Sequence, residues 1–105
     1  MITDRDITVR LVARGEDTRR ARVAECMTDE AFACHQSDGI EDCMRTMSRH
    51  QVRRLPIVDN NRRVVGIVSQ SDLARYAGGH PGRAGRRDVA DVVCAVSKPS
   101  DAAYR

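Results

Sequence analysis

The stretch Gly66-Ile67-Val68-Ser69-Gln70-Ser71-Asp72-Leu73 decides how the chain is organised, because part of it recurs 66 residues earlier. Val68–Leu73 matches Ile2–Ile7, and each copy carries a hydroxyl residue three positions before an aspartate. In both copies apolar residues precede the hydroxyl and a helix-like run follows the aspartate. A repeat at this spacing is typical of a duplicated supersecondary unit. The sequence therefore predicts one complete unit and the tail of an earlier one.

Length and composition point to one modest domain. A chain of 105 residues can bury a single core and is too short for a large enzyme. Hydrophobic residues make up 41% and charged residues 31%, which indicates a folded globular protein. The apolar run Val64–Val68 is too short to cross a bilayer, and no leader sequence opens the chain. We expect a cytoplasmic protein with no membrane partner.

The cysteines and the net charge give weaker signals. Four cysteines show no C-x-x-C spacing, so we expect reduced, mostly buried thiols and no metal site; they are Cys26, Cys34, Cys43 and Cys94. The net charge of +3 comes almost entirely from arginine, since Lys98 is the only lysine.

Hydrophobic periodicity predicts the early elements. Residues 6–14 form a helix that Gly15 ends, and polar residues 16–22 form a linker. A short strand is expected at 32–34. Ser37 and Asp38 mark the start of a second helix, with Glu41 placed as in a capping box. This helix runs to about His50 and carries one apolar face, formed by Ile40, Cys43, Met44 and Met47.

Two apolar, β-branched runs at 55–58 and 63–69 flank a tight connection and predict a strand pair. Pro56 cannot donate to a ladder, so it indicates an edge strand or a first strand residue. A helix follows at 71–77. The order is β-α-β-β-α, an α+β fold with a small sheet packed on two helices.

The C-terminal part of the sequence predicts a connector and one more helix. Gly78–Gly82 and the basic run 83–87 form a flexible connector, and 101–105 should fray. Four valines at helical spacing predict a short helix that ends near Ser97; they are Val89, Val92, Val93 and Val96. The domains are therefore 1–20 as a truncated first repeat and linker, 21–77 as the complete repeat, and 78–105 as connector and helix.

Three segments in this order resemble the cystathionine-beta-synthase (CBS) domain: Met27-Thr28, His50–Asp59 and Gly66–Leu73. The resemblance covers residues 21–77 as a complete repeat and residues 1–15 as the end of a preceding one. It implies pairing of repeats in a Bateman module, whose clefts bind adenosine-containing ligands such as AMP, ADP, ATP, S-adenosylmethionine or NAD. It implies no required cofactor, because the nucleotide is a regulatory ligand.

The resemblance also implies roles for single residues. Asp72 would accept hydrogen bonds from the ribose hydroxyls, Ser69 would contact the ribose or a phosphate, and Gly66 fills the first position of the motif. In the earlier copy Asp6 and Thr3 match Asp72 and Ser69, whereas the position that matches Gly66 lies before Met1. General chemistry agrees, because a carboxylate can accept from both hydroxyls of a cis-diol and a helix start favours anions.

Neighbouring residues complete the expected site. Arg53 and Arg54 offer planar forks for phosphate oxygens, although adjacent strand residues face opposite ways and only one should reach a given ligand. Val52 and Pro56 would form one apolar wall for adenine, and Ala33 or Cys34 another.

A structural interpretation of the Ser69–Asp72 pair stays open. A hydroxyl and a carboxylate at this spacing also cap a helix, and a structural cap would be duplicated with the repeat.

The sequence therefore favours a non-catalytic regulatory module for signal transduction. Either Met1 is an internal methionine of a longer chain, or the incomplete first repeat completes itself against another chain. Both alternatives leave an exposed apolar face, so we expect a homodimer. One alternative is a structural dimerisation module with an empty cleft. Another is weak nucleic-acid binding through arginine, which the 3% aromatic content disfavours.

Overall fold

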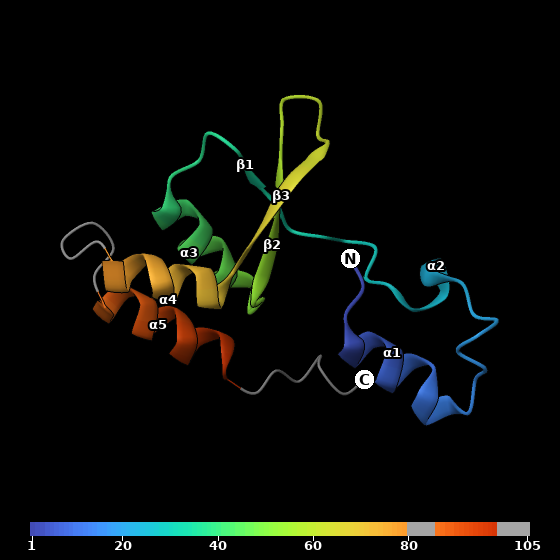
Figure 1. The fold of residues 1–105 in the computed structure, drawn as a ribbon. Coiled ribbons are helices and arrows are strands. Elements are labelled where there is room, and N and C mark those ends of the chain that lie inside the picture. The colour runs from blue at the N-terminus through green and yellow to red at the C-terminus, as the bar shows by residue number, and fades with distance from the viewer. Residues whose placement is uncertain (80–85, 99–105) are drawn as a thin grey trace. The chain divides into compact units, whose positions relative to one another are not determined.

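The computed structural model describes residues 1–79 and 86–98 and divides the chain into two compact units, Met1–Ala31 and Phe32–Arg105 (Figure 1). The sequence placed its first boundary after residue 20, whereas the contacts divide the chain after Ala31. Each unit is described below by itself.

The first unit is built around helix α1 (Asp4–Arg10), which tightens into the 3₁₀ turn η1 (Val12–Arg14). Gly15 ends this turn with a φ of 73°, a left-handed conformation that favours glycine. The predicted helix at 6–14 is therefore present, but it begins at Asp4, because Thr3 caps it.

Backbone contacts join the rest of the first unit to α1. The short helix α2 (Val23–Cys26) is followed by Thr28, whose N–H donates to the Met1 carbonyl over 2.8 Å. The Arg10 guanidinium donates to the carbonyl oxygens of Cys26 and Met27 over 3.0 and 2.7 Å. These bonds satisfy carbonyls at the end of α2 and explain why residues 21–31 group with the first unit.

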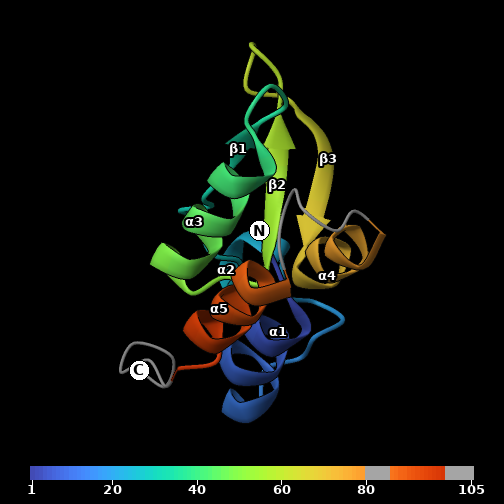
Figure 2. The same ribbon diagram turned by 90° about the vertical axis from the view of Figure 1, so that its left-hand side faces the viewer.

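The second unit is a three-stranded sheet in the order β1 (Cys34–His35), β2 (Arg54–Val58) and β3 (Val64–Ser69). β1 pairs parallel to β2, and β2 pairs antiparallel to β3. Helices α3 (Ile40–His50), α4 (Gln70–Gly79) and α5 (Arg86–Val96) gather beside this sheet (Figures 1 and 2). The predicted α+β order is confirmed, with α5 added to the β-α-β-β-α unit.

The antiparallel register decides which strand residues face the core. Leu55 is fully buried and pairs with Val68, whereas the neighbouring pair Pro56–Ile67 points to the other face. The core is formed by one strand pair and the apolar faces of the three helices; its buried members are Cys34, Cys43, Met44, Met47, Leu55, Leu73, Ala77, Val89, Val92 and Val96. The predicted apolar face of α3 is confirmed.

The position of Pro56 corrects the sequence prediction, since β2 is the central strand and Pro56 is its third residue. The Gln70 N–H donates to the Arg53 carbonyl over 2.9 Å, and hydrogen-bonded pairs alternate along an antiparallel ladder. The Pro56–Ile67 pair therefore falls at a non-hydrogen-bonded position. The proline nitrogen faces the β1 side, where pairing begins only at Ile57, so no ladder bond is lost.

Two local predictions near β1 need correction. The strand covers Cys34–His35 rather than 32–34, because the Phe32 ring stacks on His50 with ring centroids 3.5 Å apart. Helix α3 begins after Gly39, whose N–H donates to Asp42 Oδ2 over 3.0 Å. Asp38 is not the cap residue; its Oδ2 instead accepts from the His35 N–H over 2.8 Å.

The C-terminal helix α5 completes the core of the second unit. The predicted helix is present, its valines at 89, 92 and 96 are buried, and Val93 packs beside them. The Gln51 side chain donates to the Ala95 carbonyl over 3.2 Å and fixes the end of α5 against the end of α3. α4 runs to Gly79 and α5 begins at Arg86, both inside the predicted connector. Residues 80–85 of that connector and the predicted frayed tail lie outside the described residues.

All four cysteines are unpaired, and three of them are buried: Cys26, Cys34 and Cys43. Burial and the neighbouring Cys34 thiol raise the pKa of Cys43 to about 12. Within the described ranges, no helix has the length and apolar character needed to cross a membrane.

Truncating the centre of the core should be costly. Met47 is fully buried, so Met47→Ala should lower the free energy of unfolding by about 2–5 kcal/mol through lost burial and a cavity. Val23→Ala, at a residue that is 58% exposed, should cost less than about 1 kcal/mol. Urea unfolding of both variants measures this difference, and equal losses would contradict the assigned core.

Candidate functional site

The junction between β3 and α4 holds the two central candidate residues in a reciprocal cap. Ser69 ends β3, and its backbone N–H and its hydroxyl donate to Asp72 Oδ2 over 2.8 and 2.7 Å. The Asp72 N–H donates in return to Ser69 Oγ over 3.2 Å. The other carboxylate oxygen, Oδ1, accepts from the Arg75 guanidinium one turn along α4. The two oxygens of Asp72 thus have different partners.

The same arrangement recurs in the first unit, so the sequence repeat is also a structural one. The Thr3 N–H and hydroxyl donate to Asp6 Oδ2 over 2.9 and 3.1 Å, and the Asp6 N–H returns a bond of 3.2 Å. An arginine again lies near the other carboxylate oxygen: the Arg10 guanidinium is 4.0 Å from Asp6 Oδ1. The capping interpretation of this pair is therefore present in both copies.

Capping does not remove Asp72 from solvent. Its side chain keeps 39% of its surface exposed, compared with 17% for Asp6. The hydrogen bond from the Ser69 side chain, then that from its backbone, and then Arg75 hold the pKa of Asp72 below its ordinary value of 3.8. Asp72 is therefore a carboxylate at neutral pH and remains partly exposed to solvent.

The sheet register selects between the two arginines. Arg54 is the cross-strand partner of Ser69, so these side chains lie on the same face of the sheet, opposite the helices. Arg53 precedes the strand, and its carbonyl accepts from the Gln70 N–H. Both arginines are exposed. The register thus places Arg54 on the face of Ser69 and Arg53 beside the start of α4.

The expected apolar walls are only partly on this face. Pro56 lies there half-buried, next to its partner Ile67, which is 60% exposed. Val52 packs against the core instead, and Cys34 is only 3% exposed, with its Sγ 3.8 Å from Thr46 Oγ1.

Ala33 and Gly66 are the remaining candidate positions. Ala33 directly precedes β1 and is exposed. At Gly66 an added Cβ would meet only the Ile57 Cβ at 4.0 Å, so packing within the chain does not demand glycine.

Sequence reasoning missed two residues of this corner, Ile67 and Arg75. Ile67 could have been found from strand alternation, since it lies two residues before Ser69 and must share its face. Arg75 could have been found from helix spacing, since residues three apart are neighbours on a helix surface.

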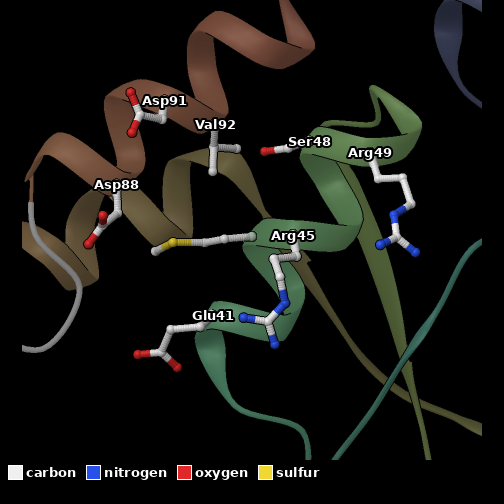
Figure 3. Close-up of a pocket in the computed structure, with 8 residues that line it drawn as sticks. Glu41, Arg45, Ser48, Arg49, Asp88, Asp91 and Val92 are labelled. Atoms are coloured by element: carbon white, nitrogen blue, oxygen red, sulfur yellow. The ribbon is translucent and has the colours of Figure 1, made fainter.

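The structure also shows a hollow of about 590 Å³ between α3 and α5 (Figure 3). Charged side chains from both helices surround an apolar floor; the lining residues are Glu41, Met44, Arg45, Ser48, Arg49, Asp88, Asp91 and Val92. None of the residues predicted from the sequence for the site lines this hollow. In the part of the chain that the structure describes, no three His, Cys, Asp or Glu side chains gather as metal ligands.

Comparison with known proteins gives a consistent match. The family model "CBS domain" matches residues 23–79. The chain is 46% identical over 74 residues to the CBS domain-containing protein YhcV of Bacillus subtilis, covering 70% of this chain and 51% of that protein. The chain thus spans about half the length of the curated relatives it matches.

Two similar solved structures contain adenosine derivatives. The CBS domain pair of protein MJ0100, in complex with 5′-methylthioadenosine and S-adenosyl-L-methionine, is 32% identical with a TM-score of 0.60. The match covers 74% of this chain and 59% of that one. CBSX2 in complex with AMP is 30% identical with a TM-score of 0.52, covering 54% of this chain and 42% of that one.

The cap makes an acid-range prediction. A carboxyl whose pKa is lowered by folding contributes stability above its unfolded pKa, and this contribution is lost as the pH falls through the folded pKa. Wild type should therefore lose stability below about pH 4 more steeply than Asp72→Asn, which keeps the acceptor oxygen without the charge. Urea unfolding between about pH 6 and about pH 2 measures both curves. If the unfolding free energy of both proteins falls equally steeply with pH in the acid range, the Asp72 charge does not stabilise the fold.

Proposed function

Because the chain belongs to the CBS domain family, we propose that its β3–α4 junction binds an adenosine-containing ligand and that the protein is a non-catalytic regulatory module. The ligand is AMP, ADP, ATP, S-adenosylmethionine or NAD. The solved relatives that contain AMP, or 5′-methylthioadenosine with S-adenosyl-L-methionine, support this ligand class.

The observation that carries the proposal is the partly exposed Asp72 carboxylate, whose side chain keeps 39% of its surface accessible. Oδ2 accepts from Ser69, whereas Oδ1 accepts from Arg75, whose side chain is 77% exposed. A ribose diol can donate to such an oxygen. The N-terminus of α4 lies beside it, and the positive end of the helix dipole favours a phosphate.

The outer face of the sheet supplies the remaining chemistry. Arg54 lies next to Ser69 and offers a planar fork to phosphate oxygens. Pro56 and Ile67 form an adjacent apolar patch that suits the face of an adenine ring. In the first unit, Thr3 and Asp6 repeat the same cap, and we propose them as a second candidate ligand-binding pair.

The proposal extends to signal transduction in the cytoplasm. The unpaired cysteines suit a reducing compartment. Ligand binding would act by shifting the population of two arrangements of the assembled modules, by no more than the difference in affinity between them.

A structural dimerisation module with an empty cleft is the second candidate, because the Ser69–Asp72 bonds alone account for a helix cap. The two candidates differ in whether any ligand binds.

Ligand titration separates them. A ligand at 100 times its Kd should stabilise the wild type by about 2.7 kcal/mol, which raises the melting temperature. Asp72→Ala should weaken binding by at least about tenfold, because each hydrogen bond to a charged group contributes about 1.5–3 kcal/mol.

Asp42→Ala is the matched control, since Asp42 caps α3 and pairs with Arg45 in the same way. It should lower stability without changing ligand affinity. Absence of stabilisation by AMP, ATP, S-adenosylmethionine and NAD would favour the structural module.

We also propose a homodimer formed through the outer face and the β3 edge of the sheet. Val64, Val65 and Ile67 are 70, 53 and 60% exposed, and β3 is an edge strand with an uncharged apolar run. Exposed apolar faces and unpaired edges both favour association.

A single charge should break this dimer. Val65→Lys places a charge within the proposed interface but outside the apolar patch of Pro56 and Ile67, and should give a monomer in light scattering coupled to size-exclusion chromatography. Val23→Lys, at a 58% exposed valine of the first unit, should remain dimeric. A monomeric wild type, or a dimeric Val65→Lys variant, would exclude this interface.

A further inference from the structure

We infer that Arg75 sets the charge preference of the Asp72 site, so that the site selects adenosine ligands with a phosphate over uncharged ones. This inference rests on the proposed function. It concerns a residue that sits outside the motif, one helical turn beyond Asp72.

The two oxygens of Asp72 have different hydrogen-bond partners. Oδ2 already accepts two hydrogen bonds from Ser69, over 2.8 and 2.7 Å, and these hold the start of α4. Giving them up would uncap the helix. A ribose diol must therefore use Oδ1, and the partner that the structure gives to Oδ1 is Arg75.

Arg75 can be displaced at little cost. The pair joins residues three apart on one helix, and its side chains are 77 and 39% exposed. Solvent screens such pairs, and their loss changes an equilibrium by about twofold. A diol therefore replaces Arg75 without a large penalty.

The displaced guanidinium remains on the first turns of α4, beside the ligand, at a corner that already carries Arg53 and Arg54. Once Oδ1 bonds to neutral hydroxyls, the positive charge of Arg75 has lost its partner. A 5′-phosphate near the same ribose restores a charge-assisted hydrogen bond, whereas an uncharged nucleoside does not.

The consequence is a change in selectivity rather than in folding. Removal of Arg75 frees Oδ1 and should raise the affinity for adenosine by up to about twofold. The same change removes a phosphate partner and should lower the affinity for AMP by about tenfold, the effect of one charge-assisted bond. The ratio of the two affinities should therefore fall by at least about tenfold.

Calorimetric titration of the full chain with AMP and with adenosine tests the inference, using wild type, Arg75→Gln and Arg45→Gln. Arg45 is the matched control, because it pairs with Asp42 at the same spacing and with similar exposure on α3. The ratio of AMP to adenosine affinity should fall only in Arg75→Gln. Melting temperatures of the three proteins without ligand should agree closely.

The remaining outcomes are distinguishable. If both ligands bind wild type and Arg75→Gln leaves their ratio unchanged, or weakens both equally, this inference is overturned and the proposed function stands. If neither ligand binds wild type while another adenosine derivative does, the selectivity inference is likewise overturned. If no adenosine derivative binds, both are overturned.

Discussion

The reciprocal hydrogen bonding between Ser69 and Asp72 fixes where β3 ends and α4 begins, and the remaining features of the site depend on it. One carboxylate oxygen is committed to the backbone and hydroxyl of Ser69, which satisfies donors that a helix start would leave free. The second oxygen accepts from Arg75, and the side chain keeps 39% of its surface exposed. A rigid cap and an available acceptor are therefore two properties of one side chain.

The sheet beside this junction has two faces with different roles. Its inner face buries Leu55 against the helices, and α5 completes that core with a stripe of valines. Its outer face carries Arg54, Pro56, Ile67 and Ser69. Since α5 covers the helical side, the apolar surface left on the second unit includes the outer face and the β3 edge. Ligand binding and association are thus both proposed for the side of the sheet that the helices leave open.

Much of the fold could be predicted because periodicity is a strong signal where one face is buried. The apolar stripe of α3 and the β2–β3 pair follow from spacing alone, and the duplicated cap follows from the repeat of Thr3 and Asp6 at Ser69 and Asp72. The prediction was wrong where several residues competed for one role. Asp38 and Glu41 looked like a cap, but Gly39 begins the helix and Asp42 supplies the oxygen.

Other details depend on tertiary pairing that no local pattern reports. Pro56 is tolerated in a central strand only because β1 pairs with the far half of β2. Cys34 lies in a strand of two residues, too short for alternation to show which way its side chain faces.

The most direct measurement is a set of ¹H–¹⁵N spectra of the labelled protein during titration with AMP. The account predicts that the Ser69 amide keeps its low-field, hydrogen-bonded position, because Oδ2 stays in the cap. The Arg75 side-chain resonance should shift as the ribose takes its place on Oδ1. A Ser69 amide that loses its hydrogen-bonded position would contradict the separate roles of the two Asp72 oxygens. So would an Arg75 side-chain resonance that stays unmoved at saturation with AMP.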